Sequence, residues 1–380
     1  MTRGTRVVAA ALVLAGLLAG CRERRPAAPL VTLDRPEAVL ERRFQQVSNV
    51  VELSDGRIAF AELRDRQFLF ADLTSGQVIP VGEHTDSALP GMPAPGQHKF
   101  PGYVLLFPGD TVGLVDFALE RTTLWTPRGD YVGQLGRIGV GGLNQAVHYD
   151  SRYNAYKEDV RSVLGGLEPG SELEFDSLNV LRIARGDTVA DTVAKLRLPP
   201  WGMGQFGEQK KMVSTVFGPR DLFGVLPDGS IWIARASTNS VDWRSPDGAW
   251  LRGERLPYAP IPVLQKEKDL FLERLRRQLA TAGAPAGIEL SYPFAEEKPP
   301  FIAGATNPAG EAWLQRPRPI EDSIPVWDAI GRNGKLLRSV RLPRSATLAG
   351  FGRDGRVYLV LREDDGTQRI ARFTVPRSPL

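Results

Sequence analysis

The stretch Leu226–Ala234 reads LPDGSIWIA and sets the pattern for the whole chain. Its pair Asp228–Gly229 is typical of a tight turn, because glycine adopts positive φ at little cost. A short strand with a central aromatic residue, Trp232, follows the turn. A second hairpin comes next, folded around Ser245–Gly248. The stretch therefore predicts a unit of two consecutive hairpins, which is four antiparallel strands.

Variants of this four-strand unit recur along the chain, at intervals of roughly 40 to 80 residues. The third unit is irregular, but the alternation of apolar and polar residues in short runs favours strands throughout. Four strands per unit, repeated around a ring, are the pattern of propeller blades. The sequence thus predicts an all-β fold, a six-bladed β-propeller of four-stranded blades. The first turns of the six units are Ser54–Gly56, Pro108–Asp110, Asp150–Arg152, Asp228–Gly229, Asn307–Gly310 and Arg353–Gly355.

The sixth unit ends after its third predicted strand, Gln368–Thr374, so a fourth strand must come from elsewhere. The segment Leu30–Pro36 resembles the fourth strands Lys195–Pro199 and Val340–Pro343. We expect Leu30–Pro36 to complete the last blade. It would join the two ends of the chain and cover an edge that otherwise invites pairing with another chain.

The N-terminus has the pattern of a targeting signal. Basic residues precede the apolar run Val7–Leu18, which is too short to span a bilayer comfortably. The following Leu18–Cys21, LAGC, resembles the bacterial lipobox, in which the cysteine is lipidated; the alternative is an ordinary signal peptide. The expected divisions are residues 1–20 as signal peptide, 21–29 as tether and 30–376 as propeller. The residue after Cys21 is Arg22 and not aspartate, which resembles the pattern of proteobacterial lipoproteins that are sorted to the outer membrane. The resemblance implies a lipid-anchored protein of the cell envelope.

Composition limits the remaining possibilities. Of 380 residues, 42% are apolar and 24% are charged, which is ordinary for a globular protein. The net charge of +4 comes without a basic cluster in a nucleic-acid-binding motif, so no nucleic-acid partner is expected. Cys21 is the single cysteine, which excludes a disulfide within one chain and a cysteine-based zinc site.

One segment departs from the β pattern. In residues 262–282 apolar side chains, Phe271 among them, recur at helical spacing, and Gly283 ends the run. This helix falls between units 4 and 5, inside a predicted insertion of about residues 258–300; a second insertion is expected at about 158–175. Three interpretations remain open: a helix that caps the end of the barrel and buries its apolar stripe there, a partner-binding helix, or a lid over the axial pocket.

The stretch Trp201–Gly207, WGMGQFG, is rich in glycine and aromatic residues. It lacks the Gly-Lys-Ser/Thr of a phosphate loop. We expect a mobile connection over one face of the ring. Trp201 and Phe206, together with Phe271 of the helix, are the candidate ligand-binding residues.

No catalytic constellation is evident. The histidines His84, His98 and His148 have no metal-ligand spacing, and no Gly-x-Ser-x-Gly elbow occurs. Asp and Glu are frequent in turns, where their side chains serve turn geometry. The sequence therefore predicts no catalytic residue, no metal ligand and no cofactor, and an enzyme is the less favoured reading.

The repeat as a whole resembles bacterial six-bladed β-propeller lipoproteins of the NHL-like type. Leu226–Trp243 and Arg353–Leu361 carry the resemblance most clearly, and Leu53–Ala61 carries it more weakly. The likeness covers about residues 30–375. It implies the fold and leaves the activity open, because propellers host many unrelated functions.

Two functions from different classes follow. The first is a monomeric, membrane-anchored propeller that binds a protein, peptide or glycan through loops on a rigid scaffold, with the membrane contacted through lipidated Cys21. The alternative is a divalent-metal-dependent lactonase, esterase or lyase, which resembles gluconolactonase-type propellers with a cation on the ring axis. The candidate axial ligands for that alternative are Asn49, Asn144, Asp221 and Asn307.

Overall fold

The computed structural model describes residues 28–86, 94–135, 147–159, 176–283, 285 and 287–376. The predicted signal peptide, the lipidation site Cys21 and most of the tether lie outside these residues. The described chain is mostly β-strand, with one α-helix, α2 (Gln265–Thr281). Among the described residues, no helix combines the length and the apolar composition needed to cross a bilayer.

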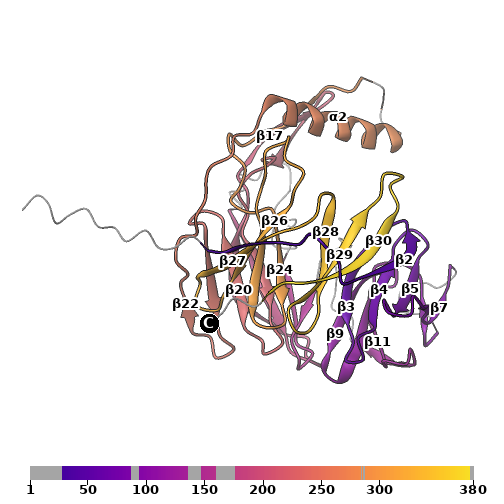
Figure 1. Cartoon of the computed structure of the whole chain (residues 1–380). Coiled ribbons are helices and arrows are strands. Elements are labelled where there is room, and N and C mark those ends of the chain that lie inside the picture. Colours follow the sequence, from indigo (N-terminus) through magenta and orange to yellow (C-terminus); the bar gives the residue numbers. More distant parts are fainter. Residues whose placement is uncertain are drawn as a thin grey trace, which may run out of the picture.

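The strands form several four-stranded antiparallel sheets, which we number in chain order (Figure 1). Each of the first three sheets consists of consecutive strands, as the repeat predicted. Sheet 1 contains β3 (Val47–Glu52), β4 (Ile58–Glu62), β5 (Gln67–Ala71) and β6 (Val78–Pro80). Sheet 2 contains β9 (Pro101–Phe107), β10 (Thr111–Asp116), β11 (Arg121–Trp125) and β12 (Tyr131–Leu135). Sheet 3 contains β13 (His148–Tyr149), β14 (Ala155–Glu158), β15 (Ser177–Ile183) and β16 (Ala190–Arg197).

The other three sheets follow the same order of strands, and two of them add a strand from the N-terminal segment. Sheet 4 contains β19 (Leu222–Val225), β20 (Ile231–Arg235), β21 (Ser240–Arg244) and β22 (Trp250–Leu251). Sheet 5 contains β24 (Ala303–Asn307), β25 (Glu311–Gln315), β26 (Val326–Ile330), β27 (Leu336–Arg341) and β1 (Leu30–Thr32). Sheet 6 contains β28 (Ala346–Phe351), β29 (Arg356–Arg362), β30 (Gln368–Thr374) and β2 (Ala38–Phe44).

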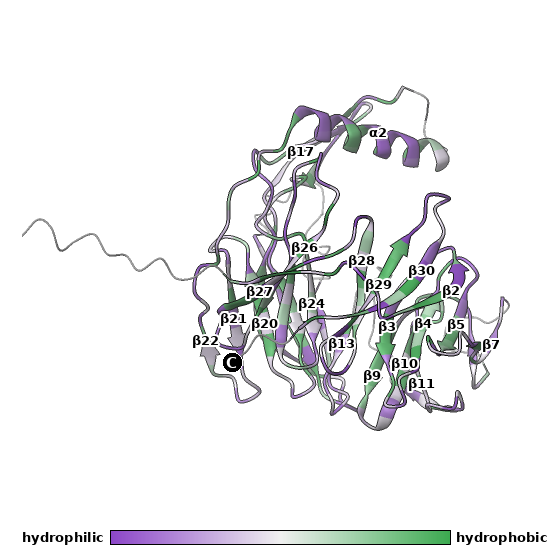
Figure 2. Ribbon diagram, viewed as in Figure 1, coloured by the Kyte–Doolittle hydropathy of each residue, from purple (hydrophilic) through white to green (hydrophobic). Residues whose placement is uncertain are grey.

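The apolar core lies between neighbouring sheets. Six clusters of buried side chains join sheet 1 to 2, 2 to 3, 3 to 4, 4 to 5, 5 to 6, and 6 back to 1. The hydropathy colouring follows this arrangement, with apolar residues along the strands and polar ones at the turns and on α2 (Figure 2). Each sheet thus buries both faces, which one antiparallel sheet cannot do alone.

Large aromatic side chains fill these layers at equivalent places. Trp232 of β20 and Trp313 of β25 are each 1% exposed, and each lies in the second strand of its sheet, three residues before an arginine, Arg235 or Arg316. Opposite Trp232 stands Gly224, where a Cβ would lie 2.5 Å from the indole ring. The small residue on the inner strand therefore makes room for the aromatic one, a detail of packing that the periodic pattern alone does not show.

The prediction that Leu30–Pro36 completes the last blade is wrong. Its strand, β1, pairs in parallel with β27 at the outer edge of sheet 5. The strand that completes sheet 6 is β2, which pairs antiparallel with β30. Leu40 and Phe44 of β2 are 0% and 3% exposed and join the cluster between sheets 6 and 1. The N-terminal segment does complete the sheet, but through residues a few positions further along the chain.

Two long connections combine into one small unit outside the sheets, at the top of Figure 1. The connection from sheet 3 to sheet 4 supplies the hairpin β17 (Trp201–Phe206) and β18 (Gln209–Ser214), and the next one supplies α2 and β23 (Leu290–Ser291). The expected mobile connection at 201–207 is therefore wrong, since Trp201–Phe206 is a paired strand. The helix is confirmed, but it does not bury an apolar stripe on the barrel end: no residue of α2 is fully buried.

Candidate functional site

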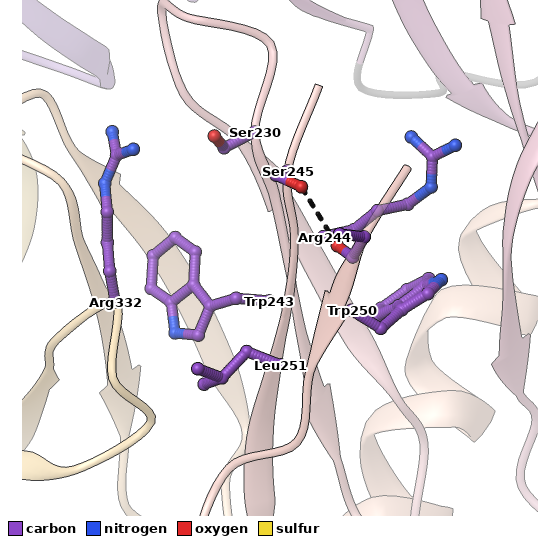
Figure 3. A pocket seen from close by; sticks show the side chains of 8 residues that line it. Ser230, Trp243, Arg244, Ser245, Trp250, Leu251 and Arg332 are labelled. Atoms are coloured by element: carbon purple, nitrogen blue, oxygen red, sulfur yellow. Dashed lines mark hydrogen bonds between the residues drawn. The ribbon is translucent and has the colours of Figure 1, made fainter. Parts of the chain in front are cut away.

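The described cavities gather on sheet 4. The strand register decides which side chains share a face, because successive residues of a strand point to opposite sides. Arg244 pairs with Trp250, and Trp243 pairs with Leu251. Figure 3 shows the outcome: Arg244 and Trp250 project to one side of the strands, and Trp243 projects to the other side, toward Arg332. Sheet 4 thus offers two different surfaces.

The face that carries Trp250 is organised by a buried carboxylate. Asp242, in the middle of β21, is 3% exposed. It accepts hydrogen bonds from Arg235 Nε (3.2 Å), Arg252 Nη1 (2.5 Å) and the backbone N–H of Gly253 (3.2 Å). A buried carboxylate needs such partners, and charge-assisted bonds to arginine are the strongest available. Asp242 therefore fixes the positions of two guanidinium groups.

These guanidinium groups line the largest of the described cavities, which we call the arginine cavity, of about 700 Å³. This volume lies in the range of small-molecule sites. Three arginines and three hydroxyl groups line it against one carboxylate, so the lining carries excess positive charge. The lining residues are Arg235, Ser237, Thr238, Ser240, Asp242, Arg252, Gly253 and Arg255.

The three arginines differ in how firmly they are held. Arg235 also bonds Asp221 Oδ2 (2.8 Å) and the carbonyl of Lys195 (2.7 Å), and only 21% of its side chain is exposed. The side chain of Arg252 is 73% exposed, although its guanidinium touches Asp242. Within the described part of the chain, Arg255 makes no hydrogen bond or ion pair and is exposed. The cavity therefore combines one largely buried cation, Arg235, with two cations whose side chains face solvent.

The outer strands of sheet 4, β21 and β22, also line a smaller pocket of about 240 Å³, which we call the Trp243 pocket (Figure 3). Trp243 is 5% exposed, and its indole Nε1 has no hydrogen-bond partner among the described residues. Arg332 reaches the pocket from the turn between β26 and β27 and pairs with Asp228 at 2.7 Å. The lining is completed by Ser230, Arg244, Ser245, Ala249, Trp250 and Leu251, so the pocket draws side chains from both faces of the outer strands.

A third cavity, also of about 240 Å³, lies at the seam between sheets 4 and 5, where the chain leaves for α2. Its walls are mostly apolar and include Leu256, Phe301 and Leu314. Its polar part is a two-pronged ion pair, in which Arg316 bonds both carboxylate oxygens of Asp328 at 2.6 and 2.7 Å. Because that pair is internally satisfied, this cavity offers few groups for a polar ligand.

The three aromatic residues predicted to bind a ligand do not converge on one cavity. Phe206 and Phe271 meet through Tyr292, with ring centroids 5.3 and 5.4 Å from it. Trp201 packs instead against the cluster between sheets 3 and 4. Phe206 and Phe271 thus form the interior of the small unit around α2, and a role of these residues in ligand binding stays a prediction.

The axial candidates have structural partners. Asn49 exchanges two hydrogen bonds with the backbone of Val104, which ties sheet 1 to sheet 2. Asp221 accepts bonds from Arg235 and from two backbone N–H groups, and Asn307 bonds within its own turn. Asn144 lies outside the described residues. Across the described ranges, no group of three or more His, Cys, Asp and Glu side chains is placed to hold a metal ion.

His84 and His98 lie opposite each other on the paired strands β7 (Glu83–His84) and β8 (Gln97–His98), with ring centroids 6.0 Å apart, and His148 lies apart from them on β13. His148 of β13 stacks edge-on against Phe223 of β19 at 4.9 Å, and loss of solvent lowers the pKa of His148 to about 4. Burial likewise lowers the pKa of His98. His84 pairs with the exposed Asp86. His148 is thus a neutral, partly buried packing group at pH 7.

Sequence reasoning missed the arginine cavity. A usable signal exists in the repeat: IWIAR at 231–235 and AWLQR at 312–316 each end in arginine, and an aspartate follows in the third strand of each unit, Asp242 and Asp328. The exposed Arg252 and Arg255 carry no such signal, because they follow the end of β22 and only the folded chain brings them to the cavity beside Asp242.

Comparison with known proteins gives fold likenesses only. No family model matches the chain, and no curated protein matches it. Among solved structures it is similar to a gluconolactonase from Xanthomonas campestris, with 12% identity, coverage of 92% of this chain and 99% of that one, and a TM-score of 0.42. It is also similar to regucalcin, a calcium-binding protein from Agrobacterium tumefaciens, with 11% identity, coverage of 93% and 99%, and a TM-score of 0.41.

A third similar structure is a streptogramin B lyase, with 9% identity, coverage of 90% and 86%, and a TM-score of 0.40. Likenesses this distant carry no statement about the chemistry of the present chain. The site has to be argued from its own residues.

Proposed function

We propose that this protein is a β-propeller binding module of six blades, whose fourth blade binds an acidic ligand in the arginine cavity. The six-blade arrangement is supported by the six clusters that link each sheet to the next and the last to the first. A ring of this kind presents rigid blades, and a rigid scaffold lowers the entropy lost when a ligand binds.

One observation carries the ligand class. The arginine cavity is lined by three guanidinium groups and three hydroxyl groups, with Asp242 as its one carboxylate. Guanidinium groups pair with carboxylate, sulfate and phosphate through parallel hydrogen bonds, and they do so best when they are held in place. Asp242 holds Arg235 and Arg252, and Arg255 keeps its donors available to a ligand.

A purely structural ion-pair cluster would look different. In sheet 5 the equivalent carboxylate, Asp328, is opposite Ser339 on the fourth strand, and the pair Arg316–Asp328 is complete with that hydroxyl. In sheet 4 the corresponding partner of the carboxylate is Arg252, the residue just after β22, whose Nη1 lies 2.5 Å from Asp242 Oδ2. Asp221 and Asp242 together balance Arg235 and Arg252, which leaves Arg255 as a cation beyond what these carboxylates require and favours a ligand.

Calorimetric titration of purified residues 22–380 with galacturonate, sulfate and phosphate tests the proposal. We expect at least one of these acids to bind, and Arg255→Ala to weaken that binding about tenfold, the effect of losing one charge-assisted hydrogen bond. Arg277→Ala, on an exposed arginine of α2, is the matched control. Equal affinities of the wild type and Arg255→Ala for every acid, or no binding at all, would refute an acid site here.

We further propose that the module is anchored through lipidated Cys21 to the envelope, at the outer membrane, as its lipobox-like LAGC segment suggests. The dual acylation expected of such an anchor gives stable attachment, because each buried methylene contributes about 0.8 kcal/mol. Fractionation of cells that express Cys21→Ser checks this: the variant should leave the membrane fraction, and a variant that stays there would contradict lipid anchoring.

A further inference from the structure

The outer part of sheet 4 carries a second set of ligand-type groups next to the arginine cavity. Register places Ser240, Asp242 and Arg244 of β21 on one face. Trp250 lies on the same face of the neighbouring strand, opposite Arg244, and Arg252, just after that strand, reaches Asp242. An aromatic and cationic surface, which we call the Trp250 stripe (Arg244, Trp250, Arg252 and Arg255), therefore joins the arginine cavity, lined by Arg252 and Arg255, to the Trp243 pocket, lined by Arg244 and Trp250.

The stripe is accessible. Trp250 is 39% exposed although it is a large aromatic residue, and the Arg252 guanidinium stands 5.7 Å from the centre of its ring. β22 is the outermost strand of sheet 4, whereas the outer edge of sheet 5 is covered by β1. An exposed tryptophan beside arginines on an open edge is the composition of a binding surface.

The length of the stripe exceeds one small acid. From Trp250 to Arg255 the chain advances five residues, a span of at most about 17 Å at the rise of an extended strand. Cationic groups recur along this span, with the indole at one end and the hydroxyls of the arginine cavity at the other. A ligand with repeated acidic groups and a flat apolar face would meet all of them at once.

We propose that the ligand is an acidic oligosaccharide, a chain of uronic acid units that runs along β22 with one sugar ring against Trp250 and its carboxylates at Arg252 and Arg255. This inference rests on the acid-binding function proposed above. The C–H face of a sugar ring stacks on an indole, its hydroxyls bond to serine and threonine, and its carboxylate suits a guanidinium group.

An extended peptide fits this edge less well. Addition of a peptide strand needs a row of unpaired backbone groups on the edge. β22 is two residues long, and the N–H of Gly253, just beyond it, is already bonded to Asp242. The side chains of the stripe, and not its backbone, therefore carry the recognition.

The test compares galacturonate with its oligomers up to the hexamer, by calorimetry on residues 22–380. We expect the hexamer to bind at least about tenfold more tightly than the monomer, because linked units bind with a high effective concentration. Trp250→Ala should remove most of that gain and leave the monomer affinity unchanged, while Trp250→Phe should restore part of it. Arg277→Ala again serves as the control.

The outcomes separate the two proposals. If the monomer binds through Arg255 and the hexamer binds no better, the oligosaccharide inference is overturned and the acid site stands. If polyglutamate or single-stranded DNA of similar charge binds as tightly as the hexamer, recognition is by charge alone and the inference also falls. If neither monomer nor hexamer responds to Arg255→Ala, the acid site itself is refuted.

Discussion

Asp242 and Asp328 occupy the same place in neighbouring sheets. Each lies at the third position of the third strand, and each accepts a hydrogen bond from an arginine two residues beyond its cross-strand partner, Arg235 or Arg316. The repeat has therefore duplicated an ion pair that joins the second and third strands. What differs between the two copies is the residue that meets the aspartate at the fourth strand: Arg252, just after β22, in sheet 4 and Ser339 in sheet 5.

This duplication predicts that the two aspartates share a structural role and differ in ligand binding. Asp242→Ala and Asp328→Ala should each lower the free energy of unfolding by about 1–3 kcal/mol, because each removes a buried acceptor of charge-assisted hydrogen bonds, although Arg235 keeps its bond to Asp221. Urea denaturation measures this loss. Only Asp242→Ala should also change the affinity for acids, since Asp328 lies outside the arginine cavity. A change of acid affinity in Asp328→Ala would contradict the division of roles.

The close contact between Gly224 and Trp232 predicts that even a methyl group at position 224 lowers the stability of the fold. In Gly224→Ala the new methyl group would lie 2.3 Å from Thr306 Oγ1 and 2.5 Å from the indole, so the layer between sheets 4 and 5 must shift. We expect a loss of about 1–3 kcal/mol in thermal or urea unfolding. Gly133→Ala is the matched control, because a Cβ there has no neighbour within 4 Å. Equal stabilities of the two variants would show that the layer between sheets 4 and 5 accommodates the added methyl group without loss of stability.

The two N-terminal strands should contribute unequally to stability. Leu40 of β2 is fully buried between sheets 6 and 1, and Leu30 of β1 is 52% exposed. Leu40→Ala should therefore cost about 2–5 kcal/mol, and Leu30→Ala should stay within about 0.5 kcal/mol of the wild type. The midpoint of urea unfolding distinguishes them. A larger loss for Leu30→Ala would restore β1 as the strand that holds the chain ends together.

The sequence predicts the strands well because turn chemistry is local. The turns at Asp228–Gly229 and Arg353–Gly355 are fixed by residues that favour positive φ, and their strands lie where the pattern places them. The choice between Leu30–Pro36 and Ala38–Phe44 depends on which apolar side chains fit a distant gap, and local pattern does not encode that fit. The hairpin at Trp201 also depends on distant partners, because it is completed by β23, nearly ninety residues away.

The same reason explains the candidate site. Asp242 reads as a polar residue in a strand, and Arg252 and Arg255 read as surface charge. Their place in one site becomes visible only in the folded sheet, where β21 pairs with β22 and the Arg252 guanidinium reaches Asp242. The aromatic character of Trp201, Phe206 and Phe271 predicts ligand binding, but aromatic side chains are equally suited to packing. Phe206 and Phe271 each contact Tyr292.

His148 predicts a pH dependence of stability. Its pKa is about 4 in the folded chain and about 6.5 when unfolded, so the unfolded chain binds more protons between these values. By linkage, the free energy of unfolding should be full above pH 6.5 and should fall by roughly 3 kcal/mol as the pH drops toward 4. His148→Phe should flatten this part of the urea-unfolding profile, because a phenyl ring packs on Phe223 without titrating. His84→Gln, at an exposed site, should leave the slope unchanged; a slope that persists in His148→Phe would assign it to other groups, with buried His98 the first to examine.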